Sequence, residues 1–255
     1  MAKANAFSRL FDHDVVAINI TLLRVNFKLE SIIKSTAILI PALNAECSLA
    51  ELVNRLRNVV GNVQIVVVDD GSTDLTNEVA ASIGAVVLRH EKNRGKGAAL
   101  QTGFEFLKNQ SEIDFILTMD ADLQHQPEDV PIFLIVQQKT NADIVIGWRK
   151  KIRTRMPVHR KLSNAITSVL VGIRSGVKIK DSQCGFRLIR RSVIESIQLE
   201  SAGYEAETEF LIKAARRGFK IEFVPVQTIY GTEKSYMTHW ATTVNFIKTI
   251  FRKYE

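Results

Sequence analysis

The residues whose chemistry stands out are Asp120-Ala121-Asp122, with Gln124 close behind. They follow a mostly apolar run at 114–119, which predicts a buried strand of a parallel sheet. In an extended segment residues 120, 122 and 124 point the same way, because side chains alternate along a strand. Two carboxylates and an amide carbonyl are hard oxygen ligands that suit Mg²⁺ or Mn²⁺ shared with a substrate phosphate. The competing interpretation is an acidic turn before the helix expected near residue 127.

A second apolar run, at 63–68, leads into Asp69, Asp70, Gly71 and Ser72. Open α/β sheets bind ligands at the carboxyl ends of their strands, so Asp69 is placed to accept hydrogen bonds from a nucleotide base or ribose. Gly71 permits a sharp bend and Ser72 can cap the following helix. An ordinary turn and cap therefore explain the same residues.

Gly95, Lys96 and Gly97 open a predicted helix. The N–H groups and the positive dipole at a helix start attract anions. Neither the P-loop pattern nor the dinucleotide-binding fingerprint is complete here. Taken alone, these residues indicate phosphate binding only weakly.

Short apolar runs alternate with amphipathic stretches along the chain. The runs lie at 36–40, 63–68, 85–88, 113–119 and 142–147, and the helical stretches at 46–59, 74–82, 96–108 and 127–138. Alternation with short connections predicts right-handed βαβ units and a mostly parallel sheet with helices on both faces. Strand-like runs at 186–189 and 221–226 and a helix near 204–217 complete one α/β unit.

The composition of the 255 residues, with 46% hydrophobic and 24% charged, is that of a soluble globular protein. No apolar run reaches the length of about 18 residues that a transmembrane helix needs. Cys47 and Cys184 are too few and too far apart for a disulfide framework and fit a reducing cytosol. Cys184 is expected to be a small packed residue and not a nucleophile.

The net charge of +7 is concentrated in one segment. Ten of the 34 Lys and Arg residues lie between Arg149 and Lys180, and that segment contains no acid. The rest of the chain, with all 27 acidic residues, is mildly acidic. A localised anionic partner follows: nucleic acid, membrane headgroups or a phosphorylated substrate. Nucleic acid is disfavoured, because few aromatic residues and no RRM, KH or helix-turn-helix signature accompany the segment.

The order of these motifs resembles the family 2 glycosyltransferases with the GT-A fold, in the polyprenyl-phosphate branch that includes dolichol-phosphate mannose synthases. The resemblance covers about residues 36 to 251. The matching segments are Ile40-Pro41-Ala42-Leu43-Asn44, Val68-Asp69-Asp70-Gly71-Ser72-Thr73-Asp74, Asn93-Arg94-Gly95-Lys96-Gly97, Asp120-Ala121-Asp122-Leu123-Gln124-His125, Asp181-Ser182-Gln183-Cys184-Gly185-Phe186-Arg187, Tyr204-Glu205-Ala206-Glu207-Thr208-Glu209, Gly218-Phe219-Lys220 and Thr228-Ile229-Tyr230-Gly231.

The resemblance implies a role for each matching position. Asp120, Asp122 and Gln124 would hold Mg²⁺ or Mn²⁺ against the donor diphosphate. The remaining donor contacts would come from Pro41, Val67, Asp69, Ala121 and Lys234. The acceptor phosphate would meet Arg149, Arg160 and Arg187. Asp122, Arg149 and Arg187 would act directly in catalysis.

The resemblance also implies the organisation of the chain. Residues 1–35 would form an N-terminal extension, 36–235 the GT-A domain and 236–255 a C-terminal amphipathic helix. The basic segment would be an acceptor-loop insertion. Apolar positions at helical spacing within 162–173 and 240–251 would either rest on the membrane surface or pack against the protein body.

The function implied is a metal-dependent, inverting transfer of a sugar from GDP-mannose or a UDP-sugar to polyprenyl (dolichyl or undecaprenyl) phosphate. The enzyme would be cytoplasmic and peripheral at the inner face of the membrane. Two alternatives stay open. A family 2 enzyme acting on a saccharide hydroxyl would need a carboxylate base, for which Glu205 and Glu207 are candidates. A non-catalytic nucleotide-binding relative is suggested by Leu43 and Ala45, where the family often has Tyr and Glu.

Overall fold

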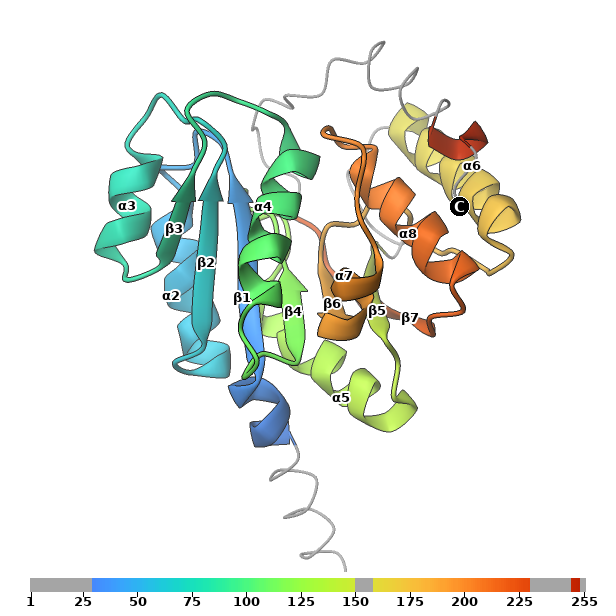
Figure 1. The fold of residues 1–255 in the computed structure, drawn as a ribbon, viewed down its shortest axis with the longest axis horizontal. Coiled ribbons are helices and arrows are strands. Elements are labelled where there is room, and N and C mark those ends of the chain that lie inside the picture. The colour runs from blue at the N-terminus through green and yellow to red at the C-terminus, as the bar shows by residue number, and fades with distance from the viewer. Residues whose placement is uncertain (1–28, 150–157, 230–248, 253–255) are drawn as a thin grey trace, which may run out of the picture.

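A computed structural model of the protein describes residues 29–149, 158–229 and 249–252, apart from the side chains of 158–166 (Figure 1). Its centre is one seven-stranded sheet with the order β3-β2-β1-β4-β6-β5-β7. The strands are β1 (Thr36–Ala42), β2 (Gln64–Asp69), β3 (Val86–Arg89), β4 (Phe115–Thr118), β5 (Ile144–Arg149), β6 (Arg187–Arg190) and β7 (Ile221–Val226).

All neighbouring strands are parallel except at β6, which runs antiparallel to both β4 and β5. Thr118 at the end of β4 therefore lies opposite Arg187 at the start of β6. The loop before β6 meets the carboxyl ends of β1, β2, β4 and β5 at the same edge of the sheet. This edge, here called the carboxyl edge, collects Asp69, Asp120 and Arg149.

The helices cover the sheet in two groups (Figure 1). One group joins α2 and its neighbours α3 and α5, and the other joins α4 with α7 and α8, and α8 with α6. The helical elements are α2 (Leu49–Val60), α3 (Thr76–Ser82), α4 (Lys96–Lys108), the 3₁₀ turn η1 (Pro127–Asp129), α5 (Val130–Thr140), α6 (Val158–Ser175), α7 (Arg191–Ser196) and α8 (Ala206–Arg216). The predicted α/β fold with a mostly parallel sheet is confirmed.

The strands form because their apolar runs are buried on both faces, as in parallel sheets generally. Ile38, Leu39, Ile40, Val67 and Leu117 are each at most 1% exposed. Gly103 in α4 lies directly over the Leu39 side chain, so that a Cβ at this position would collide with the leucine methyl groups. The absent side chain lets the middle of α4 pack closely on β1.

The ends of the described chain bear on the predicted boundaries. Residues 29–34 are helical and Ile32 reaches the core, so part of the expected extension is packed onto the domain that begins at β1. Of the predicted C-terminal helix only 249–252 lies within the described residues. Arg174 of α6 donates hydrogen bonds to the carbonyls of Ile250 and Arg252, which holds this segment beside α6. Among the described helices, none combines the length and apolarity needed to cross a membrane.

Candidate active site

The acidic pair lies in a turn and not at the end of an extended strand. β4 ends at Thr118, Ala121 and Asp122 are turn residues, and Leu123 has a φ of +57°. The expectation that 120, 122 and 124 alternate along an extended segment is therefore wrong. Asp122 instead accepts the backbone N–H of Gln124 at 3.0 Å, which closes the turn and leaves both carboxylates at the carboxyl edge.

A second connection holds this turn from the other side. The carbonyl of Gln124 accepts the N–H of Ile229 at 2.9 Å, and His125 pairs with Thr228 in an isolated antiparallel bridge. Thr228 and Ile229 thus lie against the acidic turn. Residues about 100 apart in sequence are joined here because β7 returns to the carboxyl edge beside β5.

Asp120 is engaged by a buried lysine. The Lys96 ammonium lies 2.5 Å from Asp120 Oδ1 and 2.8 Å from Glu207 Oε1. Burial works to lower the pKa of Lys96, but the two carboxylates outweigh it and the pKa is raised. Burial likewise works to raise the pKa of Asp120, and the Lys96 charge outweighs it so that the pKa is lowered. Lys96 and Asp120 are therefore both charged near neutral pH.

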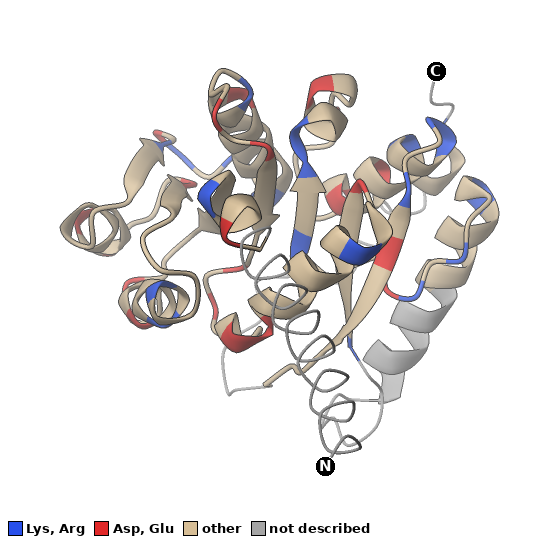
Figure 2. Ribbon diagram, turned by 90° about the horizontal axis from the view of Figure 1, so that it is seen from below, with Lys and Arg blue, Asp and Glu red and all other residues tan. Residues whose placement is uncertain are grey.

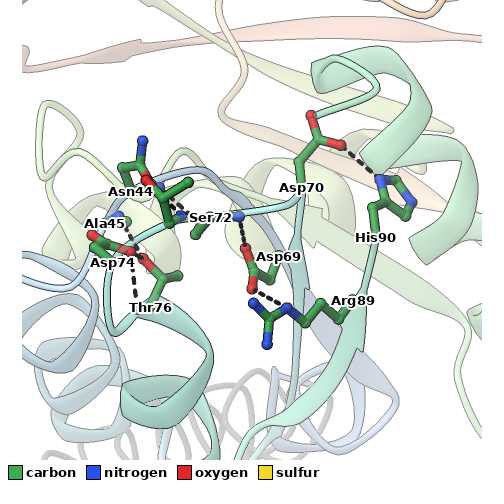
Figure 3. A network of polar contacts seen from close by, with 10 residues as sticks. Asn44, Ala45, Asp69, Asp70, Ser72, Asp74, Thr76, Arg89 and His90 are labelled. Atoms are coloured by element: carbon green, nitrogen blue, oxygen red, sulfur yellow. Dashed lines mark hydrogen bonds and ion pairs between the residues drawn. The ribbon is translucent and has the colours of Figure 1, made fainter. Parts of the chain in front are cut away.

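A buried carboxylate, Asp70, organises the loop that carries this lysine. Asp70 accepts the N–H groups of Arg94 and Gly95 at 2.9 and 2.8 Å, and His90 Nδ1 lies 2.6 Å from Asp70 Oδ1. His90 Nε2 in turn lies 2.9 Å from Thr102 Oγ1. Figure 3 shows Asp70 and His90 pointing toward one another beside the Asp69 turn. Of the N–H groups that the glycine-rich loop was expected to offer to a phosphate, that of Gly95 is thus bound by a side chain of the protein.

The predicted base-binding residues fall into two kinds. Asp69 and Pro41 lie at adjacent ends of β2 and β1, whereas Val67 is a core residue with no exposed side chain. Asp69 is fully buried: Oδ1 accepts the N–H of Ser72 at 2.9 Å, and Oδ2 lies 3.4 Å from Arg89 Nε without a hydrogen-bond partner in the described structure (Figure 3). An acceptor oxygen on this carboxylate therefore remains for a polar ligand.

The loop after β1 is joined to the loop after β2. Asn44, with a φ of +51°, receives the N–H of Thr73 on its side-chain oxygen, and the N–H of Ala45 donates to Thr76 Oγ1 at 2.7 Å (Figure 3). Glu46 accepts the N–H of Leu75 at 2.9 Å, at the start of α3. These hydrogen bonds hold the loop that contains Ala45, where the family often has Glu, against the loop after β2.

Arg149, a predicted phosphate ligand, ends β5 and forms a two-pronged ion pair with Asp181. Its Nε and Nη2 lie 2.7 and 2.9 Å from the two Asp181 oxygens. Burial works to raise the pKa of Asp181, but Arg149 outweighs it and the pKa is lowered. The carboxylate therefore stays ionised and fixes the orientation of the guanidinium.

The other predicted phosphate ligands are placed differently. Arg187 is only 3% exposed and donates to the backbone carbonyls of Cys184, Ser182 and Glu207. It braces the loop before β6 and lowers the pKa of Asp120 through its charge, after the larger effects of burial and Lys96. Arg160 lies in α6, but its side chain is outside the described part of the chain, as is all of Lys234.

Two residues near the turn are inert at neutral pH. Burial, the largest influence, lowers the pKa of His125 to about 4, so the imidazole is neutral. Burial also raises the pKa of Cys184 to about 12, and its Sγ lies 3.7 Å from His125 Nε2. The expectation that Cys184 is a packed residue is confirmed by its 1% exposure.

The donor set of the acidic turn fits a hard divalent cation. Asp120 already accepts a cationic group, the Lys96 ammonium, and Asp122 stands two residues away with Gln124 beside it. No group of three or more His, Cys, Asp or Glu side chains suited to a metal occurs within the described ranges. A cation at this turn would accordingly rest on two carboxylates, with the rest of its shell from amide, water or substrate oxygens, as is usual for Mg²⁺.

Sequence reasoning gave Asp70 and Asp181 no role, connected Lys96 only weakly with phosphate binding and named Glu207 only as a candidate base. Glu207 is in fact 6% exposed and bound to Lys96, so it is a buried ion-pair partner. One signal was present in the sequence: α8 carries Glu207 and Glu209 among apolar residues, and acids are seldom buried without a partner.

An open α/β sheet with acidic residues at its carboxyl edge has its ligand-binding side where these acids lie. The model of glycosyl transferase family 2 matches residues 37–198. The chain belongs to this family and is a glycosyltransferase.

Named relatives point to one branch of the family. The chain is 31% identical to the UDP-N-acetylglucosamine–dolichyl-phosphate N-acetylglucosaminyltransferase of Methanococcus voltae, over 76% of this chain and 85% of that one. It is 33% identical to the undecaprenyl-phosphate mannosyltransferase of Micrococcus luteus, over 74% and 81%. These names support the polyprenyl-phosphate sugar synthase branch.

Solved structures confirm the fold. Glucosyl-3-phosphoglycerate synthase from Mycobacterium tuberculosis, crystallised with Mn²⁺, UDP-glucose and phosphoglyceric acid, matches with a TM-score of 0.71 at 20% identity. The match covers 87% of this chain and 81% of that one. The GT-A architecture expected from the sequence is thereby established.

Replacing Asp70 by Asn should lower the free energy of unfolding by about 3 kcal/mol, because a buried charge with three partners loses its ionic and hydrogen-bonding role. Urea denaturation followed by circular dichroism measures this. The matched control is Glu105→Gln, whose ion pair with Lys108 lies at the surface of α4 and should contribute less than about 1 kcal/mol. Equal effects of the two substitutions would contradict the assigned role of Asp70.

Proposed function

We propose that the protein transfers a sugar from a nucleotide-sugar donor, GDP-mannose or a UDP-sugar, to a polyprenyl phosphate. The observation that carries the proposal is the acidic turn, where Asp120 and Asp122 face the carboxyl edge between the buried carboxylate of Asp69 and the Asp181-held guanidinium of Arg149. A site with acidic residues that can hold a cation on one side and an arginine on the other suits the binding of two anionic substrates.

The donor would lie along β1, β2 and β4. Asp69 has an oxygen without a hydrogen-bond donor in the described structure and would accept an N–H of the base or a ribose hydroxyl. Pro41 ends beside it, and Ala121 and Lys234 would complete the donor contacts, as the family pattern implies. A bound Mg²⁺ or Mn²⁺, held by Asp120, Asp122 and Gln124, would neutralise the charge that develops on the departing diphosphate.

The acceptor would be its own nucleophile. A phosphate monoester has a second pKa of about 6 and is largely dianionic near neutral pH, so attack on the anomeric carbon needs no general base and proceeds with inversion. The ion pair of Glu207 with Lys96 supports this, because it leaves this buried carboxylate next to the turn poorly placed to remove a proton. The enzyme would contribute position and charge.

Arg149 and Arg160 would receive the acceptor phosphate. Arginine suits this role because its planar fork makes paired hydrogen bonds to phosphate oxygens. Arg187, although buried, would support them with its positive charge and by fixing the loop before β6. Figure 2 shows that the described helices outside the basic segment carry both Lys or Arg and Asp or Glu. The basic segment, which has no acid, is therefore where an anionic lipid would be favoured.

The exposed face of α6 would rest on the membrane that holds the acceptor. Within the described part of this helix, Thr167, Ser168 and Val171 are buried, whereas Val169 and Ile173 are 61% and 76% exposed. Val169 and Ile173 therefore point away from the protein body. Phe251, 72% exposed, lies on the segment that Arg174 holds beside α6. An apolar strip among Lys and Arg favours an anionic bilayer surface, and we assign this to the cytoplasmic face.

Incubating the purified protein with labelled GDP-mannose, UDP-glucose or UDP-N-acetylglucosamine, Mn²⁺ and undecaprenyl or dolichyl phosphate should give an organic-extractable labelled product with one donor. Asp120→Asn should reduce the rate about 100-fold or more, since charge stabilisation of the leaving group is weakened. Glu105→Gln serves as the control and should keep full activity. Transfer only to a saccharide hydroxyl, or no transfer with any donor, would overturn the proposal.

Arg149→Lys should raise the KM for the polyprenyl phosphate about tenfold or more while leaving the KM for the donor unchanged. Lysine keeps the positive charge but cannot present the guanidinium fork to a phosphate. Initial rates with each substrate varied in turn separate the two constants. An unchanged acceptor KM together with a raised donor KM would place Arg149 on the donor side instead.

Ile173→Asp should weaken binding to vesicles of phosphatidylglycerol and phosphatidylcholine about tenfold or more, because an isoleucine that leaves water contributes about 1.5–3 kcal/mol. Co-sedimentation measures the bound fraction. The matched control is Leu75→Asp at the start of α3, since Leu75 is an apolar residue of similar exposure, 61%, far along the chain. Equal losses in both variants, or no binding of the unaltered protein, would count against this surface.

A further inference from the structure

The contact between Lys96, Asp120 and Glu207 is built into the fold. Gly97 is the second residue of α4, and a Cβ there would lie 2.6 Å from both Ala206 Cβ and the Ser201 carbonyl oxygen. Only glycine therefore lets α4 approach the start of α8 this closely. This approach brings Lys96 on α4 within reach of Glu207 on α8, 111 positions later in the chain.

A second glycine, Gly185, packs against the same three side chains. A Cβ on Gly185 would lie 2.9 Å from Asp120 Oδ2, from Glu207 Oε1 and from Lys96 Nζ. The loop before β6 is therefore packed directly on all three charged groups, and Thr118 Oγ1 holds that loop by donating to the Gly185 carbonyl at 2.7 Å. The Lys96 ammonium is therefore held in one position between two carboxylates.

The positive charge of Lys96 disfavours a second cation beside Asp120. The Lys96 ammonium lies within ion-pair distance of two carboxylates, and its side chain is only 14% exposed, so water screens its charge poorly. A divalent ion bound to Asp120 would lie about 2.1 Å from a carboxylate oxygen, while the ammonium contacts an oxygen of the same group. The two cations would repel each other strongly across this short distance.

We propose that Lys96 is an internal counterion that competes with the divalent cation for Asp120, and that Glu207 retains the ammonium when the metal takes Asp120. This inference rests on the proposed function, because it requires that Asp120 binds the metal. Its consequence is an order of binding. The metal alone binds weakly, and it binds well only together with a diphosphate, whose negative charge offsets the lysine.

Removing the charge of Lys96 tests the competition directly. Lys96→Met should tighten the binding of Mn²⁺ in the absence of nucleotide about tenfold or more, measured as free Mn²⁺ by electron paramagnetic resonance. Lys96→Arg keeps the positive charge and should bind Mn²⁺ as weakly as the unaltered protein. Lys108→Met, on the same helix but paired with the surface residue Glu105, should also leave the affinity unchanged.

Each outcome separates this inference from the proposed function. Adding Asp120→Asn to Lys96→Met should abolish the tight Mn²⁺ binding, since the ion uses that carboxylate. Binding that depends on Asp120 but is no tighter in Lys96→Met overturns the counterion role alone. Binding that ignores Asp120, or no binding to any of these proteins, overturns the metal site and the counterion role together.

A measurement on the unaltered protein covers the case in which Lys96→Met fails to fold. The side-chain ¹⁵N resonance of the Lys96 ammonium, identified by its loss in Lys96→Arg, should shift on titration with Mg²⁺ as the group moves from Asp120 toward Glu207. The same titration of Asp120→Asn should leave the resonance in place. An Asp120-dependent Mg²⁺ site that leaves the ammonium resonance unmoved in the unaltered protein contradicts the proposal.

Discussion

The carboxylate of Asp70 is the interaction on which the site depends. It is almost fully buried, and a buried charge is tolerated only with several partners. Here the partners are a histidine from the end of β3 and two backbone N–H groups of the loop before α4. One side chain at the end of β2 therefore sets where α4 begins, and with it where Lys96 meets the acidic turn. Without Asp70, the loop after β2 and the acidic turn after β4 would not be held at a fixed position relative to each other.

The two halves of the carboxyl edge use the same principle with different residues. After β4, Lys96 joins Asp120 to Glu207, and at the end of β5, Asp181 orients Arg149. Each pair is largely shielded from water, so each charge is kept by its partner and each group is held in one orientation. Such preorganisation is what transfer between two anions requires, because the chemistry needs placement and charge balance more than proton transfer.

Much of the fold could be predicted from the sequence, since apolar runs and helical spacing located every strand of the parallel half. The acidic turn was found for the same reason, because it directly follows a buried run. Its geometry was not, because nothing in the letters marks Leu123 as left-handed. The antiparallel entry of β6 was also not predicted, as a four-residue strand carries no sign of its direction.

The contact of Lys96 with Asp120 and Glu207 could not be predicted from the sequence for a further reason. Lys96 and Glu207 look like ordinary charges in the first turns of two helices, and only the close approach at Gly97 brings them together. Conversely, Arg187 looked like a phosphate ligand, but its donors are used by backbone carbonyls of the loop before β6. Charge type can be read from the sequence, whereas exposure and partners depend on tertiary packing.

The outward-facing apolar residues of α6 have a kinetic consequence for an enzyme that docks through them. The donor arrives from three-dimensional solution, but the acceptor is encountered by diffusion within a plane. The rate would then follow the mole fraction of acceptor among the lipids and fall on surface dilution with inert lipid, even when the total acceptor in the vessel is constant.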